Sequence, residues 1–259
     1  MTYEDILGLK RPSDPQIAPD GSRIVFVVEE WNKEEDSYNQ DLYLASVRVG
    51  DITRLTYHPK NDAHPRWNPE RDSVAFLSQR EDNAKQVFFL TFPGGEPTQL
   101  THHKKSVESF AWSSDGNTIF FVAPVPDDQE EEKERKTKKV ILVDEKLPFA
   151  HIWKLDVASG ATTQLTKGEF HVVEIDPSPN EVSIAFIRQA TPKIADLLTR
   201  ELYVTSLDGG EPERMTRNGY AEARPRWSAD GNRIAYLSEA DGNPSAGPSR
   251  IHCHVCDRR

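Results

Sequence analysis

The sequence predicts an all-β fold of the β-propeller class, built from four-stranded blades. Three observations predict it: a turn motif that recurs along the chain, a short apolar run after each copy, and a closing dipeptide at the end of each repeat. The clearest copy of the motif is Trp112–Ile119, which reads Trp-Ser-Ser-Asp-Gly-Asn-Thr-Ile. Self-similarity at a period of roughly 40 to 50 residues is typical of repeat folds whose units stack on their neighbours.

The motif reverses the chain between two strands, because Pro, Asp, Asn and Gly supply the backbone angles of a tight turn. The copies are Ile17–Ile24, Trp67–Val74, Trp112–Ile119, Ser178–Ile184 and Trp227–Ile234. The apolar runs that follow are Ile24–Val28, Val74–Leu77, Ile119–Val122, Ile184–Ile187 and Ile234–Leu237. Unbroken apolar runs of this length indicate strands that are covered on both faces.

A further strand, a hairpin turn and a closing dipeptide complete each repeat. The further strand signals are Leu42–Leu44, Val87–Leu90, Ile152–Leu155 and Leu202–Val204. The closing dipeptides are Leu55–Thr56, Leu100–Thr101, Leu165–Thr166 and Met215–Thr216. Their spacing fits a blade of roughly 40 to 50 residues that carries insertions.

These signals divide the chain into a lead-in and an incomplete propeller. Residues 1–13 are predicted to form a short amphipathic helix, with Thr2 as N-cap and Pro12 as its stop. The partial propeller covers residues 14–259. Its predicted blades are residues 14–56, 62–101, 107–166, 172–216 and an incomplete 222–259, where Ile251–Val255 can add one more strand.

The insertion at residues 124–139 has the most unusual composition, since an acidic run turns into a basic one. Glu131 and Arg135, like Glu132 and Lys136, have the spacing that supports a solvated helical turn. The segment is therefore predicted to lie on the surface, either as a mobile excursion or as a loop that meets a partner or lies at a substrate entrance.

Composition excludes several classes of protein. The 259 residues are 36% hydrophobic and contain no apolar stretch long enough for a membrane-spanning helix, nor a secretory leader, so a cytoplasmic protein is expected. A net charge of −10 argues against nucleic-acid binding. The two cysteines, Cys253 and Cys256, are too close together to staple the fold and are expected to be reduced.

No catalytic, cofactor-binding or metal-binding residue is predicted. The sequence lacks the Gly-x-Ser-x-Gly nucleophile elbow and both glycine-rich nucleotide fingerprints. The tightest group of potential metal ligands, His252–Cys256, lacks a second ligand pair, and neighbouring residues of a strand point to opposite faces.

The remaining candidates have structural interpretations beside the functional ones. The histidines, His102–His103 included, are predicted to be solvated loop residues, and the repeat tryptophans are predicted to pack between blades rather than to stack on a ligand. The residues considered for the mouth of a central channel are Arg66, Arg226, Glu108 and Glu222.

The opening stretch, Glu4–Val28, resembles the start of the propeller domain in the prolyl oligopeptidase family of serine peptidases, and its acylaminoacyl-peptidase and dipeptidyl-peptidase-like branch most of all. Ser13–Gly21 is its most specific part, since the later repeats resemble any TolB-like or WD40-like propeller. The resemblance covers residues 2–240. It implies a propeller that caps a C-terminal α/β-hydrolase domain and admits only short peptides.

The expected function is therefore that of a non-catalytic propeller, with a serine aminopeptidase or acylaminoacyl-peptidase as the parent enzyme. Its expected partners are the hydrolase domain, peptides and, through open blade faces, further copies of the chain. The alternative is a stand-alone TolB-like propeller that binds a protein partner. An enzyme with its site inside this segment is disfavoured, because the polar residues form no catalytic constellation.

Overall fold

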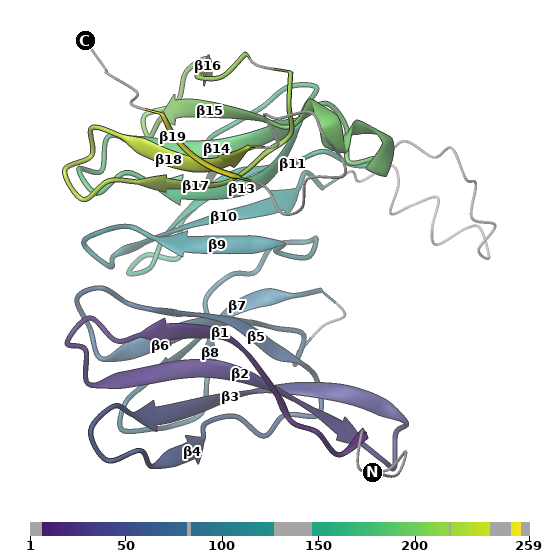
Figure 1. Ribbon diagram of the computed structural model, residues 1–259, viewed down its shortest axis with the longest axis vertical. Helices are drawn as coiled ribbons and strands as arrows, with labels where there is room; N and C mark the ends of the chain where they lie inside the picture. The colour runs from purple at the N-terminus through teal and green to yellow at the C-terminus, as the bar shows by residue number, and fades with distance from the viewer. Residues whose placement is uncertain (1–6, 82–83, 127–146, 218, 239–249, 255–259) are drawn as a thin grey trace. The chain divides into compact units, whose positions relative to one another are not determined.

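The fold consists of five antiparallel sheets, each built from consecutive strands (Figure 1). The computed structural model describes residues 7–81, 84–126, 147–217, 219–238 and, for the backbone, 250–254. The chain divides into two compact units, Met1–Val107 and Glu108–Arg259. Each unit is described by itself below.

The first unit contains two four-stranded sheets. The first sheet is β1 (Arg11–Ile17), β2 (Arg23–Asn32), β3 (Ser37–Ser46) and β4 (Ile52–Arg54). The second sheet is β5 (Asp62–Trp67), β6 (Ser73–Ser78), β7 (Gln86–Thr91) and β8 (Thr98–Gln99).

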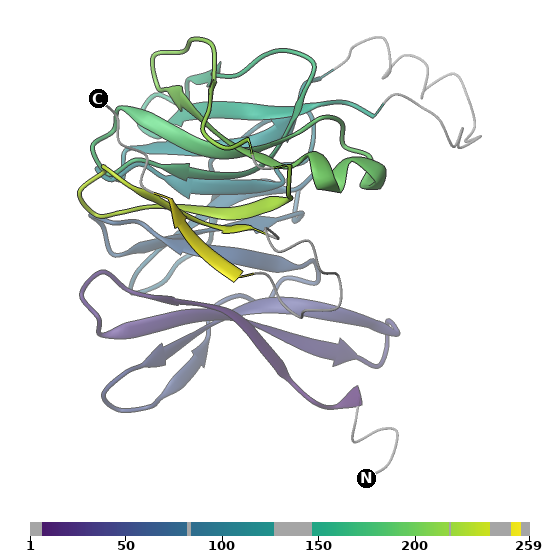
Figure 2. The same cartoon turned by 45° about the horizontal axis from the view of Figure 1, so that its top comes forward.

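The second unit contains the other three sheets, and β17 and β18 lie beside β13 and β14 in both ribbon views (Figures 1 and 2). The third sheet is β9 (Ser109–Trp112), β10 (Thr118–Pro124), β11 (Ala150–Asp156) and β12 (Thr162–Gln164). The fourth is β13 (His171–Pro177), β14 (Ser183–Gln189), β15 (Glu201–Ser206) and β16 (Glu213–Arg214), with the 3-10 helix η1 (Ile194–Thr199) between β14 and β15. The fifth has three strands, β17 (Glu222–Trp227), β18 (Ile234–Ser238) and β19 (Arg250–His254).

This architecture confirms the predicted fold class. Every turn motif joins the first and second strands of a sheet, and every apolar run forms the second strand. The runs at Ile119–Val122 and Ile184–Ile187 are buried throughout, as a strand covered on both faces requires. The last predicted strand is confirmed as β19. At the N-terminus, residues 1–6 of the predicted helix lie outside the described part, and residues 11–13 belong to β1.

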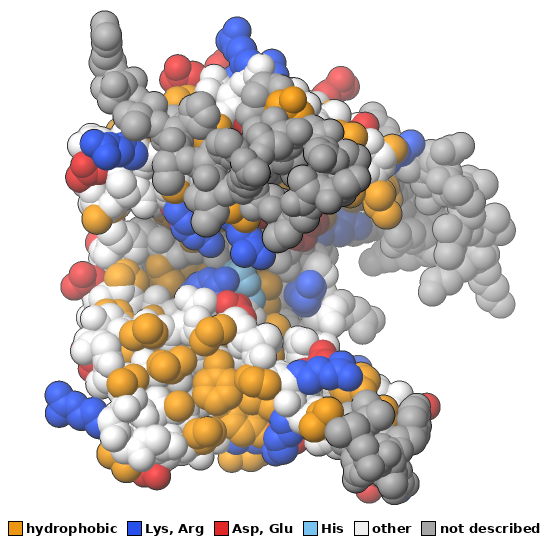
Figure 3. Space-filling model, viewed as in Figure 1, with side chains coloured by type: hydrophobic (Ala, Val, Ile, Leu, Met, Phe, Trp, Pro, Cys, Tyr) orange, Lys and Arg blue, Asp and Glu red, His pale blue; other side chains and the backbone are white. Residues whose placement is uncertain are grey.

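In the first unit, alternate side chains of β2 have different surroundings. Val25 and Val27 point into a core shared with Phe76 and Phe88 of the second sheet. Phe26 packs on Tyr43 of β3, with ring centroids 6.0 Å apart, and both rings are partly exposed. Hydrophobic side chains gather on this outer face of the first sheet (Figure 3). One face of the first sheet thus has a partner blade and the other faces solvent.

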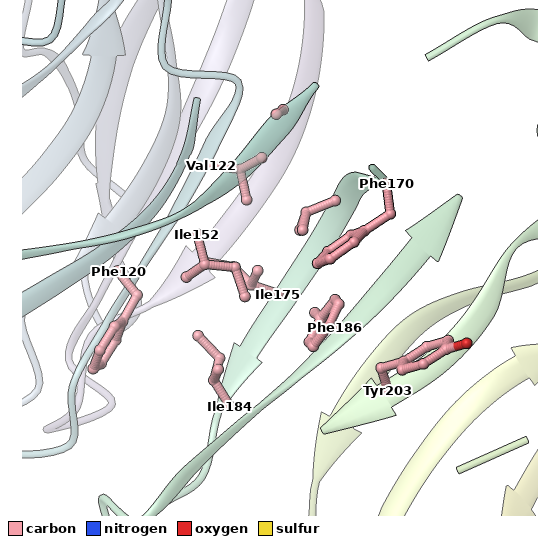
Figure 4. Close-up of a cluster of buried hydrophobic side chains, with 10 residues drawn as sticks. Phe120, Val122, Ile152, Phe170, Ile175, Ile184, Phe186 and Tyr203 are labelled. Carbon is pink, nitrogen blue, oxygen red and sulfur yellow. The ribbon is translucent and has the colours of Figure 1, made fainter. Parts of the chain in front are cut away.

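In the second unit, neighbouring sheets share apolar cores. The core between the third and fourth sheets combines side chains from β10, β11 and β13 to β15 (Figure 4). It contains Phe120, Val122, Ile152, Phe170, Ile175, Ile184, Phe186 and Tyr203. A second core joins Ile187 and Val204 of the fourth sheet to Ile234 and Tyr236 of the fifth. Burial of both sheet faces explains why the runs are continuously apolar.

Two of the repeat tryptophans, Trp67 and Trp227, tie their blade to the preceding one, which confirms the packing interpretation for these two. Trp67 Nε1 donates a hydrogen bond to the backbone oxygen of Gln16 at 2.9 Å, and its ring stacks on Phe92. Trp227 Nε1 donates to the backbone oxygen of Asp176 at 3.0 Å. Each indole thus joins the first strands of two consecutive blades, with Trp67 buried and Trp227 partly buried.

The closing threonines attach the end of each repeat to its third strand. Thr56, Thr101, Thr166 and Thr216 are all buried. Their Oγ1 atoms accept hydrogen bonds of 2.8 to 3.0 Å from the backbone N–H groups of Leu42, Val87, Ile152 and Leu202 respectively. In all four repeats the donor lies 14 residues before the threonine. The fourth strands are short, so this side chain supplies a bond that a longer strand would make with its backbone.

Candidate functional site: the first strands of the blades

The first strands carry β-bulges at which polar residues adopt unusual backbone angles. The pairing register of β1, β5 and β17 shifts between their first and last residue pairs. Within these shifts Asp14, His64 and Arg224 have φ angles of 46°, 56° and 53°. Non-glycine residues in this left-handed region cost of order 1 kcal/mol or more, and bulges that re-aim side chains are common beside functional sites. The first strands are therefore the place to look for a site.

In the first unit, the bulges of β1 and β5 bring together a polar group, here named the Asp14 cluster and consisting of Asp14, Gln16, His64 and Arg66. Arg66 Nη1 donates to both carboxylate oxygens of Asp14, at 3.0 and 2.9 Å. Its Nη2 lies 3.2 Å from His64 Nδ1, and Gln16 Nε2 donates to Asp14 Oδ1 at 2.8 Å. The side chains of Asp14, His64 and Arg66 are 26 to 29% exposed, so water still reaches the cluster.

In the second unit, β13 and β17 carry the corresponding residues, here named the Asp176 cluster and consisting of Glu174, Asp176, Arg224 and Arg226. Glu174 Oε2 accepts a hydrogen bond from the backbone N–H of Arg224 at 2.8 Å. Asp176 Oδ2 accepts one from the backbone N–H of Trp227 at 2.7 Å, and its Oδ1 lies 3.6 Å from Arg226 Nη1. In both clusters a carboxylate of one first strand lies beside an arginine of the first strand of the next blade.

The two clusters differ in how their cations are held. Arg66 and Arg226 each fold back to donate to the oxygen of the preceding proline, at 2.6 and 2.7 Å. Arg66 is clamped by the Asp14 carboxylate, whereas the Arg226 side chain is 61% exposed and only loosely paired. Arg224 is exposed as well. The Asp176 cluster therefore presents two cationic side chains to solvent beside a partly buried carboxylate, that of Asp176.

Burial raises the pKa of Asp176 to about 6, although the hydrogen bond from Trp227 and the positive charge of Arg226 both act to lower it. The carboxylate is thus close to its titration point at neutral pH. Both clusters contain charged side chains that can bind groups of the opposite charge.

The other two residues considered for a channel mouth have different surroundings. Glu108 is exposed, and its Oε2 lies 4.0 Å from His171 Nε2. Glu222 is completely buried, which contradicts its predicted place at the mouth. Its Oε2 accepts hydrogen bonds from the backbone N–H of Leu202, at 2.8 Å, and from the hydroxyl of Thr216. Glu222 therefore helps to hold the end of the fourth blade, at Thr216, against the third strand of that blade, at Leu202.

The histidines also require a correction, because His151 is 2% exposed and not a solvated loop residue. Its Nδ1 lies 3.2 Å from the hydroxyl of Thr166, and its Nε2 lies 3.2 Å from the backbone oxygen of Gly168. These partners fit a neutral ring, and burial lowers the pKa of His151. His171 is mostly buried too, and its Nδ1 accepts a hydrogen bond from the backbone N–H of Ala150 at 3.1 Å.

The remaining sequence candidates are the metal-ligand group and the charged insertion. Within the described residues, no group of three or more His, Cys, Asp or Glu side chains is placed to hold a metal ion. The side chains of His252–Cys256 and most of the 124–139 insertion lie outside that part of the chain. Across the same described segments, no helix is long and apolar enough to cross a membrane.

The repeated antiparallel sheets, each built from consecutive strands, define a segment of a β-propeller. A model of the PD40 family, described as the TolB beta propeller domain, matches residues 10–140, half of the chain. The chain belongs to this PD40 family of TolB-like propellers.

Known proteins that resemble the chain include both peptidases and TolB proteins. Dipeptidyl-peptidase 5 of Porphyromonas endodontalis is 31% identical over 274 residues, which cover 95% of this chain and 39% of that protein. The acylaminoacyl peptidase of Pyrococcus horikoshii aligns with a TM-score of 0.67 at 16% identity, over 97% of this chain and 39% of that one. A putative TolB from Agrobacterium tumefaciens aligns with a TM-score of 0.65 at 21% identity, over 96% of this chain and 78% of that one.

The structural and the sequence similarities support different conclusions. The structural ones, at low identity, support the propeller fold. The sequence relatives add a link to peptidases, since the matched region is 39% of dipeptidyl-peptidase 5 and 21% of the uncharacterized peptidase YuxL of Bacillus subtilis, which is 32% identical over 139 residues. The chain therefore corresponds to a minor part of those proteins.

Proposed function

We propose that this chain supplies the non-catalytic propeller of a serine peptidase, which covers the active site of an α/β-hydrolase domain and admits short peptides to it. The observation that carries the proposal is the match to a dipeptidyl-peptidase along 95% of this chain. The first-strand clusters support it, because exposed Arg224 and Arg226 can bind carboxylate groups of peptides, and Glu174 and Asp176 can bind amino groups. In this role the hydrolase domain cleaves the peptide bond, and both domains lie in the cytoplasm.

A chimaera tests the selection of short peptides. This chain replaces the matched region of the Porphyromonas endodontalis dipeptidyl-peptidase, and kcat/KM is measured for a dipeptidyl chromogenic substrate and for a denatured protein. We expect the chimaera to cleave the short substrate and to discriminate against the protein by at least tenfold more than the same enzyme without a propeller. Equal discrimination by the two enzymes contradicts the proposal.

The alternative function is that of a protein-binding module of the TolB type. The TolB description of the family and the similarity to a putative TolB favour it. The apolar outer face of the first sheet gives such a module a surface, and it is also the face through which two copies of the chain would associate (Figure 3). Sedimentation of the purified chain tests whether two copies associate through this face. A concentration-dependent dimer that Phe26→Asp abolishes supports self-association, and a strict monomer contradicts it.

A further inference from the structure

The Arg-Pro-Arg sequence of β17 presents two positive charges to water on a backbone with little freedom. Arg224 and Arg226 are exposed, whereas Pro225 between them is buried. Arg224 has a φ angle of 53°, and strained positions of this kind persist where their surroundings hold them, often beside ligands. The proline ring fixes the next φ angle. Because the backbone that carries both arginines is already ordered, it loses little further freedom on binding a ligand.

The guanidinium of Arg226 keeps hydrogen-bond donors that the protein does not use. Within the described residues, its partners are the backbone oxygen of Pro225, 2.7 Å from Nη1, and the carboxylate of Asp176, whose Oδ1 is 3.6 Å from Nη1. The second distance is too long for a hydrogen bond. Most N–H groups of this side chain therefore remain for a ligand. Arg66, at the same place in the second blade, instead donates to both carboxylate oxygens of Asp14.

The carboxylates of the Asp176 cluster hold the backbone of β17 rather than the arginine side chains. Glu174 Oε2 accepts a hydrogen bond from the backbone N–H of Arg224 at 2.8 Å, and Asp176 Oδ2 accepts one from the backbone N–H of Trp227 at 2.7 Å. These bonds fix the strand, and they leave the Arg226 side chain only loosely paired. The two exposed cations can therefore be neutralised further by an anionic ligand.

The charge of the cluster favours a ligand with a single negative charge. Arg224 and Arg226 lie beside the carboxylates of Glu174 and Asp176, which would repel a doubly charged phosphate more strongly than a carboxylate. A planar carboxylate also matches the fork of an arginine side chain. Since the net charge of the chain is −10, its overall field does not attract anions, and binding depends on this local pair of arginines.

We propose that Arg224 and Arg226 form a subsite for a peptide carboxylate, and that the propeller thereby favours peptides that carry an accessible carboxylate over peptides that carry none. This inference rests on the proposed peptidase function, which makes peptides the ligands of the chain, and it adds a substrate preference to that function. Arg226 supplies the fork of N–H donors, and Arg224 supplies the second positive charge. The carboxylate comes either from the C-terminus of the peptide or from an acidic side chain.

Peptide binding to the full chain tests the subsite. Three short peptides share one neutral sequence and an N-terminal dye: the first ends in an amide, the second ends in a free carboxylate, and the third ends in an amide but contains one glutamate. Kd is measured by fluorescence anisotropy. The better of the two carboxylate-bearing peptides is expected to bind at least tenfold more tightly than the first, equivalent to about 1.4 kcal/mol, and it identifies the source of the carboxylate.

Variants connect this preference to the arginines. Arg224→Gln and Arg226→Gln are each expected to remove most of the difference in Kd between the carboxylate-bearing and the amidated peptide. Arg233→Gln is the matched control and should keep the difference, because Arg233 is exposed in the turn between β17 and β18 and its loss changes the net charge equally. Circular dichroism of each variant shows that the fold is retained.

The possible results separate this inference from the function on which it rests. Equal Kd values for the three peptides, no binding of any of them, or a preference that Arg226→Gln leaves unchanged would overturn the subsite. Inorganic phosphate that displaces the bound peptide at a lower concentration than acetate does would overturn the choice of a singly charged ligand. The chimaera tests the peptidase function separately. If it discriminates against the denatured protein while the carboxylate preference is absent, only the subsite is overturned.

Discussion

The partly buried carboxylate of Asp176, whose side chain is 22% exposed, makes the stability of the chain depend on pH in a defined direction. Burial raises the pKa of Asp176 from 3.8 to about 6. A difference of about two pH units between the folded and unfolded states corresponds to about 3 kcal/mol, since one unit is worth about 1.36 kcal/mol. Asp176→Asn removes the charge and keeps a carbonyl oxygen that can accept the hydrogen bond from Trp227.

The sign follows from which state binds the proton more tightly. Between pH 4 and 6 the folded chain holds a proton on Asp176 that the unfolded chain releases, so this stabilisation is fully present below pH 4 and is lost as the pH rises to 6. Asparagine stays neutral throughout. We therefore expect Asp176→Asn to raise the free energy of unfolding by up to about 3 kcal/mol at pH 7 and to change it little at pH 4.

Urea unfolding of the full chain, followed by tryptophan fluorescence at pH 4, 5, 6 and 7, measures this difference. The contributions of all other titrating groups cancel when the variant is compared with the unaltered chain at each pH. Asp208→Asn removes an exposed carboxylate from the turn after β15 and controls for the change in net charge. A difference that stays constant with pH, or a variant that is less stable at pH 7, would refute the reasoning, the latter because attraction to Arg226 would then outweigh burial.

Three further predictions follow from other features. Burial lowers the pKa of His171 to about 4, so the contribution of the neutral ring to stability is present above pH 6.5 and is lost as the pH falls to 4. His171→Asn keeps an acceptor for the backbone N–H of Ala150, and urea unfolding should show a smaller loss of stability between pH 6.5 and 4 for this variant. Thr166→Val leaves the buried N–H of Ile152 without its acceptor and should lower the free energy of unfolding by about 1 to 3 kcal/mol, against less than about 0.5 kcal/mol for the exposed Thr163→Val. The purified chain should not hydrolyse aminoacyl or acyl-amino-acid chromogenic substrates, because it has no nucleophile elbow.

Each of these has a clear opposite outcome. An unchanged pH profile in His171→Asn would mean that the ring is solvated in solution. Similar destabilisation by Thr166→Val and Thr163→Val would show that the closing threonine acts through packing or strand propensity rather than through its hydroxyl. Turnover that disappears on treatment with a serine-directed inhibitor would mean that the chain contains a catalytic site.

The repeat made the fold predictable at the level of strands. The turn motifs, apolar runs and closing dipeptides all carry local signals, since Asp-Gly turns and continuous apolar runs have few alternative structures. The bulges were not predictable in the same way. Asp14, His64 and Arg224 are ordinary polar residues in sequence, and only the pairing of neighbouring strands forces their backbone into the left-handed region.

The burial of polar residues such as His151 and Glu222 was also not predicted, although the sequence contains part of the information needed. His151 precedes the third-strand run by one residue, as Asp41 and Gln86 do in the first two blades. All three contact the hydroxyl of the closing threonine of their blade. Aligning the repeats on that threonine places His151 at a buried polar position. In the fourth blade the residue that contacts the closing threonine is Glu222, which belongs to β17, the first strand of the next blade. An alignment of the repeats on the threonine does not reveal this change of strand.

The constant spacing of the closing threonine has a consequence for how such a gene can change. From the third-strand N–H to the threonine that accepts its hydrogen bond, every described repeat keeps 14 residues, so an insertion there would pull the two groups apart. The connection between the second and third strands carries no such constraint, and its length differs widely, from residues 33–36 in the first blade to 125–149 in the third. Evolution can therefore lengthen a blade in the connection between its second and third strands without loosening the hydrogen bond by which the threonine closes it.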